Sequence, residues 1–367
     1  MISGHATPEG TKKFASKYGA MPENYRTVQG LTLSNVGVGT YLGNPDSQTD
    51  ILVTDAIKKS ILAGVNVIDT AINYRAQKAE RAVGKAISDL VHEGKIGRDS
   101  IFVSTKNGYV TNDGDIKEDF WAYVQREYAK PGVVKPDDIS SGYHCMTVPY
   151  LEDQLNRSLK NLGLECIDLI YLHNAVEGQI QDIPKEQFLK NLRDVMQMYE
   201  QKRKEGKIRY YGMATWECFR VPMEHPQYLS IVDVLCIAQD VGGQDHGFRF
   251  IQLPYNLYLD QAFMLKNQQL GGSSVSILDA AQSNGIGVFT SVPLMQGRLL
   301  APGVLPDFID LGPSLKCLQF IRSTPGVLAP LVGQKTSAHV EENLKILMIP
   351  PLNRDEFESV LKKLTSS

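Results

Sequence analysis

The sequence has few of the features that mark secreted or membrane-embedded proteins. Its 367 residues include five cysteines, widely scattered and without a CxxC pair, so neither a disulfide framework nor a zinc site is indicated. No apolar run approaches the roughly 18 residues that a membrane-spanning helix requires. The polar N-terminal stretch, residues 1–25, lacks the apolar core of a signal peptide. These absences predict a cytoplasmic protein with no metal centre and no membrane partner.

The sequence also lacks an excess of charge of either sign. Lysine and arginine number 38 and aspartate and glutamate 41, giving a formal net charge of −3, which offers no sign of a nucleic-acid partner. Apolar residues make up 43%, enough to bury a sizeable core. Barrels of alternating strands and helices reach more than about 250 residues as one unit. We therefore expect residues 1–367 to form a single domain.

Short β-branched runs alternate along the chain with longer stretches of helical periodicity. Eight runs qualify as strands: residues 33–40, 66–70, 100–106, 166–173, 208–215, 248–256, 285–292 and 326–333. Eight parallel strands close a barrel. An open doubly wound sheet usually carries GxGxxG after its first strand, and GVGTYLG at residues 37–43 lacks that spacing. We predict a (β/α)8 TIM barrel, with a β-hairpin turning on Gly30 as a plug for its floor.

The connection after the third predicted strand, residues 107–149, is unusually long. Connections of this length inside a compact domain are generally functional or disordered. It leaves from the face where barrel enzymes form their active sites. It also carries aromatic residues that are unusual in a solvated segment: Phe120, Trp121, Tyr123, Tyr128 and Tyr143. We interpret the segment as a lid, with a surface excursion as the alternative.

Ionisable side chains stand where three neighbouring predicted strands end. The second strand delivers Asp69 and, from its loop, Tyr74, the third delivers Lys106, and the fourth delivers His173. Each has a simpler interpretation: Asp69 as a turn cap, Tyr74 as a half-buried aromatic and His173 as a donor to a backbone carbonyl. Lys106 is harder to explain that way, because a lysine that closes an apolar run needs a carboxylate partner, and Asp69 is the nearest candidate.

Together these four side chains suggest carbonyl chemistry. A neighbouring ammonium favours phenolate, so Lys106 is expected to lower the pKa of Tyr74 toward neutral pH, while Asp69 keeps Lys106 charged. His173 would orient a substrate oxygen beside the Tyr74 hydroxyl, and the pair would stabilise the negative charge that grows as a carbonyl accepts hydride. The arrangement indicates carbonyl reduction with an external hydride.

Five motifs spread over most of the chain carry a family resemblance: DTAINY followed by Glu80 and Gly84, STK, DLIYLH, IQLPYN and VGQKTSAHVEEN (332–343). With these motifs the chain resembles the aldo-keto reductases. The resemblance implies that Asp69, Tyr74, Lys106 and His173 form a catalytic tetrad with tyrosine as the general acid. It further implies a nicotinamide cofactor extended across the barrel mouth, with Gln252 bonded to the nicotinamide amide.

The last of these motifs has a physical reason to bind phosphate. A strand ending at Gly333 and a helix starting near Ser337 would aim backbone N–H groups and the positive end of the helix dipole at an anion. Lys335 adds a charge there, although an ordinary amphipathic helix remains the alternative. The resemblance implies that this segment, with Gln334, holds the 2′-phosphate, and that Glu342 and Asn343 contact the adenine. We expect NADP(H), with NAD(H) possible.

The sequence departs from the family pattern at several positions. A Ser-Asn pair that commonly helps to hold the carboxamide is Ala214-Thr215 here, which leaves Thr215 as the hydrogen-bonding side chain. The FTSVPL segment, with Ser291 and Leu294, lacks the aromatic that often stacks on the nicotinamide. His339 stands where an arginine often meets the 2′-phosphate, and it is a weaker, pH-dependent cation.

The substrate pocket is less well specified. Trp121 and Tyr143 in the long connection and Trp216 after the fifth strand are expected to line an apolar or sugar-stacking pocket, with simple packing as the alternative. A nucleophile at His144-Cys145 is disfavoured because no third group is evident. The primary hypothesis is an NADP-dependent oxidoreductase that interconverts a small aldehyde or ketone with its alcohol. The alternatives are a lyase or aldolase that forms a Schiff base on Lys106, and a non-catalytic cofactor-binding regulatory subunit.

Overall fold

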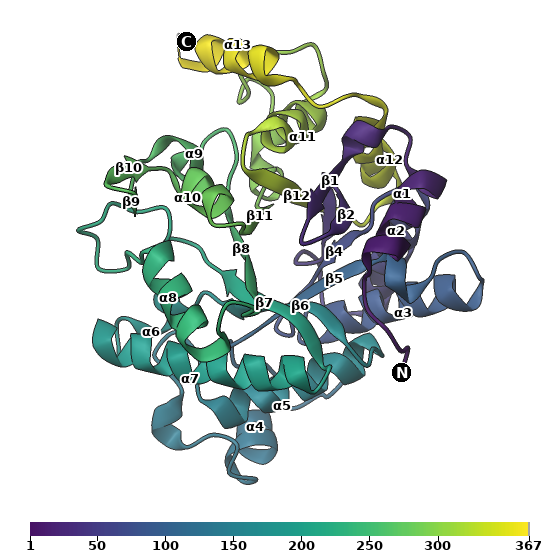
Figure 1. Ribbon diagram of the computed structural model, residues 1–367. Coiled ribbons are helices and arrows are strands. Elements are labelled where there is room, and N and C mark those ends of the chain that lie inside the picture. Colours follow the sequence, from purple (N-terminus) through teal and green to yellow (C-terminus); the bar gives the residue numbers. More distant parts are fainter. Residues whose placement is uncertain (366–367) are drawn as a thin grey trace.

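Eight parallel strands form a closed barrel in the computed structural model, which describes residues 1–365 (Figure 1). Around the barrel the strands follow the order β11-β12-β3-β4-β5-β6-β7-β8. Their bounds are β3 Gly37–Gly39, β4 Val67–Asp69, β5 Phe102–Asn107, β6 Ile167–His173, β7 Ile208–Ala214, β8 Phe248–Pro254, β11 Gly287–Ser291 and β12 Val327–Gly333. All eight predicted strands are confirmed, and so is the TIM barrel.

Helices surround the barrel as an outer ring (Figure 1). The principal ones are α2 Ser47–Leu62, α3 Lys78–His92, α5 Val148–Leu162, α7 Lys185–Lys204, α8 Ile231–Gly242, α10 Ile277–Ser283, α11 Pro313–Ser323 and α12 Ser337–Leu344, with α13 Arg354–Thr365 following. In α3, the residues Ala79, Val83, Ala86 and Ile87 are buried, which is the i, i+4, i+7, i+8 spacing of one helical face. Helix α3 therefore covers the strands with one apolar face.

The predicted N-terminal hairpin is confirmed and closes one end of the barrel. Strands β1 Tyr25–Val28 and β2 Leu31–Ser34 pair antiparallel, and the two turn residues Gln29 and Gly30 both have positive φ (49° and 77°), as a two-residue hairpin turn requires. Leu31 and Leu33 join a buried cluster with the inward-facing side chains of the barrel strands. The hairpin thus acts as an apolar plug.

Some elements were not predicted. Helix α1 Pro8–Tyr18 starts at Thr7, whose hydroxyl accepts from the Gly10 N–H, and it packs beside β2. Strands β9 Gln268–Leu270 and β10 Ser273–Val275 form a second small hairpin outside the barrel. Among the helices that the structure describes, none combines the length and the apolar character needed to cross a membrane.

The long connection after β5 folds mainly against the outside of the barrel. Its helical part, α4 Phe120–Val124 and the π-helical turn Gln125–Ala129, buries Tyr123 and Tyr128. The Tyr128 ring lies 5.2 Å from that of Tyr150 on α5, and the Arg157 guanidinium lies 4.9 Å from the Tyr128 ring centre. The middle of the connection is therefore a layer on α5, which gives its aromatic residues an ordinary packing role.

Candidate active site

The two-residue repeat of a β-strand decides which side chains enter the barrel. Phe102, Ser104 and Lys106 share the inner face of β5, and Leu169, Tyr171 and His173 share that of β6. Near the base these inner positions are apolar, whereas at the carboxyl ends of the strands they become polar. The polar set comprises Asp69, Lys106, His173, Gln252 and Ser291. The barrel therefore collects its polar side chains at one mouth.

Asp69 and Lys106 form a buried ion pair. Lys106 Nζ lies 2.5 Å from Asp69 Oδ2 and donates a second hydrogen bond of 2.8 Å to the Thr70 carbonyl. Ser104 Oγ donates to the other Asp69 oxygen at 2.7 Å. Burial lowers the pKa of Lys106, and the Asp69 carboxylate offsets this effect. The carboxylate partner that the sequence predicted for Lys106 is present.

Tyr74 lies in the tight turn between β4 and α3. The three residues after it, Arg75, Ala76 and Gln77, all have left-handed φ values (50°, 51° and 72°), an uncommon run without glycine. The Gln77 N–H donates to the Ile72 carbonyl at 2.9 Å, and the Ala76 carbonyl accepts from the Gly114 N–H at 2.9 Å. Backbone contacts within the turn and from the long connection thus hold the tyrosine in place.

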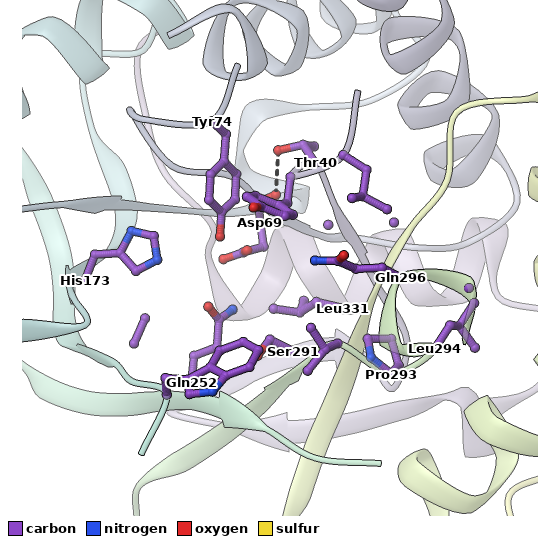
Figure 2. A pocket seen from close by; sticks show the side chains of 18 of the residues that line it. Thr40, Asp69, Tyr74, His173, Gln252, Ser291, Pro293, Leu294, Gln296 and Leu331 are labelled. Atoms are coloured by element: carbon purple, nitrogen blue, oxygen red, sulfur yellow. Dashed lines mark hydrogen bonds between the residues drawn. The ribbon is translucent and has the colours of Figure 1, made fainter. Parts of the chain in front are cut away.

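The Tyr74 ring brings the four predicted catalytic side chains into one group. Lys106 Nζ lies 4.8 Å from the centre of the Tyr74 ring, and the His173 ring centre lies 5.8 Å from it in an edge-on arrangement. Figure 2 shows the Tyr74 hydroxyl, the His173 ring and the Gln252 amide converging on one side of a pocket. The sequence therefore located the members of a single cluster.

The predicted direction of the Tyr74 pKa is wrong. Burial raises that pKa above its ordinary value of 10.0, with further contributions from the Asp69 carboxylate, Tyr41 and Tyr109. Burial of the ring and the Asp69 carboxylate together outweigh the effect of the nearby Lys106 ammonium on the phenol. The tyrosine is consequently a protonated hydroxyl at neutral pH.

His173 is neutral and is supported from behind. Burial lowers its pKa well below 6.5, and the nearby Lys106 and His144 add to the effect. His144 Nε2 donates to the His173 carbonyl at 2.8 Å, and the Gln179 amide donates to His144 Nδ1 at 3.0 Å. The Nδ1 atom of His173 has no hydrogen-bond partner within the described residues. The backbone of His173 is therefore held in place, while the Nδ1 atom of its ring is left unpaired.

The pocket is a cavity of about 670 Å³ at the barrel mouth. Asp69, Tyr74 and His173 line it, whereas Lys106 is fully buried behind them. Of the predicted cofactor residues, those in the lining are Thr215, Gln252, Ser291, Leu294, Gly333, His339, Glu342 and Asn343. Within residues 1–365, the amide nitrogen Gln252 Nε2 is buried without a hydrogen-bond partner, which suits a ligand carbonyl in the cavity.

Gln334 and Lys335 lie outside the lining. The Gln334 side chain is buried between Ser60 Oγ (2.8 Å) and Asn343 Nδ2 (2.9 Å), so it fixes the segment rather than facing the cavity. The Lys335 amine approaches Gly43, where a Cβ atom would lie 3.6 Å from it. Lys59 on α2 hydrogen-bonds the Ser337 hydroxyl at the start of α12, a cation that sequence reasoning missed.

The predicted substrate residues divide between two places. Trp216 lines the cavity, but Trp121 and Tyr143 are exposed and pack on each other outside its lining, with ring centres 5.7 Å apart. From residues 107–149, the lining includes Tyr109 alone. In this structure the long connection therefore does not cover the pocket as a lid would.

Two lining tyrosines were missed by sequence reasoning. Tyr41 follows β3 and Tyr109 follows β5, and their rings lie 5.0 Å from Tyr74 and 5.1 Å from His173, respectively. Inspecting uncharged residues after each strand would have found both. Cys145 is buried, and burial raises the pKa of its thiol to about 11, which agrees with the sequence argument against a nucleophile there.

Comparison with known proteins identifies the family of this barrel. The sequence model of the aldo/keto reductase family matches residues 35–303. The chain belongs to the aldo/keto reductase family. Among its relatives, "Uncharacterized oxidoreductase YqkF" of Bacillus subtilis (strain 168) is 23% identical over 341 residues, covering 90% of this chain and 92% of that protein. The NADH-specific methylglyoxal reductase of Escherichia coli (strain K12) is 26% identical over 287 residues, covering 77% and 70%.

A solved aldo/keto reductase supports the same fold. The crystal structure of the enzyme from Klebsiella pneumoniae in complex with NADP and acetate has a TM-score of 0.61 at 20% identity, covering 94% of this chain and 96% of that one. An identity this low carries the architecture and not the residue roles. Family membership and the relatives above support an oxidoreductase.

Proposed function

We propose that this aldo/keto reductase is an NADP(H)-dependent enzyme that interconverts an aldehyde or ketone with its alcohol. The observation that carries the proposal is the cluster of Tyr74, His173 and the Lys106–Asp69 pair beside one cavity of about 670 Å³. A phenolic hydroxyl and a neutral imidazole at one wall are suited to an oxygen atom on which negative charge grows.

Each side chain then has a defined role. Tyr74 holds its proton, because its pKa is raised, and gives it to the substrate oxygen as that oxygen becomes more basic. The Lys106 amine, 4.8 Å from the centre of the phenol ring, stabilises the negative charge left on Tyr74. His173 orients the oxygen through its neutral imidazole. A bound nicotinamide would supply or accept the hydride.

The described residues fit that cofactor. The unpartnered Gln252 amide and Thr215 would hold the carboxamide, and Glu342 and Asn343 on α12 would meet the adenine. Lys335 and Lys59 place two positive charges near the start of α12, which favours a 2′-phosphate and therefore NADP(H). NAD(H) is the alternative, since one relative is named as NADH-specific.

Cofactor preference is tested by titrating the intrinsic fluorescence with NADPH and with NADH. We expect NADPH to bind more tightly, and Lys335→Met to weaken NADPH by about tenfold, roughly 1.4 kcal/mol, while NADH is little changed. Equal affinities for the two cofactors in the parent protein would contradict the preference for the phosphate. Lys12→Met on the exposed surface of α1 is the matched control.

The mechanism is tested by Tyr74→Phe with a reactive aldehyde. We expect kcat to fall by about 10²- to 10⁴-fold, as for removal of a general acid, with NADPH binding retained. Tyr18→Phe, at the last residue of α1, removes a hydroxyl that bonds the Lys95 carbonyl and serves as the control. Undiminished turnover in Tyr74→Phe would exclude the proposed acid.

The two other hypotheses are less well supported. Lys106 has no exposed surface and donates to Asp69 and Thr70, so it is poorly placed to form a Schiff base. Borohydride trapping of a carbonyl substrate on Lys106 would reverse this judgement. A non-catalytic regulatory subunit would bind NADPH and reduce none of a broad set of aldehydes and ketones.

A further inference from the structure

The wall of the cavity beside Tyr74 is rich in aromatic side chains. Tyr41 and Tyr109 flank the Tyr74–His173 pair, and Trp216 and Leu300 add apolar surface elsewhere in the lining. Tyr109 OH accepts a hydrogen bond of 3.2 Å from the Asn174 amide, which fixes that tyrosine at the wall. Within the described residues, the side chains that line the cavity include no lysine or arginine.

The ionisable groups near Tyr74 do not create a positive field. Asp69 is neutralised by Lys106 at 2.5 Å, and His173 is uncharged because burial lowers its pKa. The lining histidine at the other end, His339, lies on α12 together with the acidic Glu342. An anionic substrate group in the Tyr74 end would lose water and find no cation in return, which disfavours its binding.

Trp216 is held in its position by charged groups behind it. Glu177 Oε1 accepts backbone N–H bonds from Trp216 (2.9 Å), Glu217 (2.5 Å) and Cys218 (3.1 Å). Arg220 Nε donates to the Trp216 carbonyl at 3.0 Å. Although 43% of Trp216 is exposed, both its backbone polar groups are bonded, so the backbone that presents the indole to the cavity is fixed.

We propose that this site selects uncharged aldehydes and ketones bearing an aromatic or apolar group, excludes carboxylated and phosphorylated ones, and uses Trp216 as a specificity-determining wall. The inference rests on the proposed carbonyl chemistry and deepens it. Its basis is that no lysine or arginine among residues 1–365 lines the cavity, together with the aromatic surface of Tyr41, Tyr109 and Trp216.

The test compares carbonyl pairs that differ only in charge, with NADPH as reductant. 4-Formylbenzamide and 4-formylbenzoate have nearly the same shape, and glyceraldehyde and its 3-phosphate form a second pair. We expect kcat/KM to be at least about tenfold higher for the neutral member of each pair, since a difference of one tenfold corresponds to roughly 1.4 kcal/mol. Equal or faster turnover of the anionic members would overturn the inference.

A second variant tests the role of Trp216. Trp216→Arg places a cation on the wall, and we expect it to raise the benzoate-to-benzamide ratio of kcat/KM by about tenfold relative to Trp216→Phe. An identical ratio in the two variants would show that Trp216 does not set the selectivity. Trp216 is partly exposed, so both substitutions are expected to leave the core intact.

Failure of the inference can be separated from failure of the proposed function. The chain has two tryptophans, so Trp121→Phe leaves Trp216 as the sole indole reporter. Adding Tyr74→Phe to this variant removes the proposed acid, so titrating the NADPH-loaded protein with the same benzamide and benzoate ranks their affinities without turnover. Preferential benzamide binding with no turnover by the parent protein would contradict the reductase activity alone, whereas equal or tighter benzoate binding would contradict the charge selectivity whether or not turnover occurs.

Discussion

Two titratable groups at the cavity, Tyr74 and His173, shift in opposite directions, and both shifts favour the uncharged form. The His173 pKa lies well below 6.5 and the Tyr74 pKa above 10.0. Above pH 6.5 the imidazole has therefore already lost its proton, and below pH 10.0 the phenol still has its proton. These are the forms that the proposed mechanism requires, a neutral imidazole to orient the substrate oxygen and a protonated phenol to donate to it during reduction.

The pH dependence of reduction follows from these forms. With NADPH and an aldehyde that does not ionise, we expect kcat/KM to stay level between pH 6.5 and pH 10.0. Alcohol oxidation needs a base instead, so its rate is expected to rise with pH throughout this range. An acid limb near pH 6.5, or a loss of reduction below pH 10.0, would contradict the assignment.

The contacts of Glu177 predict that this residue positions Trp216. Glu177→Ala removes the acceptor for three backbone N–H groups and is expected to raise KM for 4-formylbenzamide by about tenfold, roughly 1.4 kcal/mol, with a smaller change in kcat. In the Trp121→Phe background the emission of Trp216 is expected to shift. Glu217→Ala, a neighbouring glutamate, is the control, and unchanged Trp216 emission in Glu177→Ala would refute the positioning role.

At the residue scale, the sequence was informative where the position of a side chain follows from strand geometry alone. Asp69, Lys106 and His173 end parallel strands, so they were predicted to share one mouth, and they do. The direction in which the Tyr74 pKa shifts depends on how completely the site is buried, and no local sequence pattern reveals this burial. Glu177 likewise bonds the backbone of Trp216, which lies 39 residues further along the sequence, and no local sequence pattern reveals this contact.

At the scale of elements, the long connection supports the segments that carry Tyr74 and His173 from two sides. Its first part meets the Tyr74 turn, where the Gln77 amide donates to the Asn112 carbonyl at 3.0 Å. Its last part inserts His144 behind His173, against Gly108 and Gly178, where added Cβ atoms would lie only 2.3 Å and 2.7 Å from the imidazole side chain. Two glycines thus make room for one buried histidine.

His144→Ala tests this support. The change leaves the His173 carbonyl without its donor and opens a cavity, so we expect a loss of about 2–4 kcal/mol in unfolding free energy and a lower kcat. Urea unfolding and steady-state kinetics measure the two effects. His225→Ala, at an exposed turn, is the control, and an unfolding midpoint equal to that of the parent would disprove the supporting role.

The elements themselves were predicted unevenly, for a physical reason. Strands such as β5 and β6 are buried on both faces and appear as continuous apolar runs, which single-sequence patterns detect well. Helix α1 has a narrow buried stripe, Gly10, Thr11 and Phe14, and depends on docking against β2. Strands β9 and β10 have three residues each, too few to establish an alternating pattern. The lid role of residues 107–149 stays a prediction without support from the cavity lining.

Across the whole molecule, the two ends of one strand, β6, have different contacts: one end lies in the barrel floor and the other at the cavity. β6 begins beside Asp168 at the plugged end and finishes at His173 at the open end. Asp168 Oδ1 accepts from the Ala6 N–H at 2.6 Å, and Oδ2 accepts from Arg98 at 2.7 Å and from the Val103 N–H at 2.8 Å. This buried carboxylate joins the N-terminal segment, the loop before β5 and the barrel floor.

Asp168→Ala is therefore expected to reduce stability without altering catalysis. It leaves the Arg98 charge buried and unpaired, which costs about 3–5 kcal/mol, because removing one partner of a buried pair exposes the full desolvation penalty of the other. The exposed Arg193–Asp240 pair offers a matched control: Asp240→Ala is expected to change the unfolding free energy by less than about 1 kcal/mol. Urea unfolding measures both changes, and kcat/KM of the folded variants at low temperature measures the catalytic effect. Equal losses of unfolding free energy in the two variants would show that the buried Arg98–Asp168 pair contributes no more to stability than the exposed pair. A fall in kcat/KM of folded Asp168→Ala would show that the two ends of β6 are coupled.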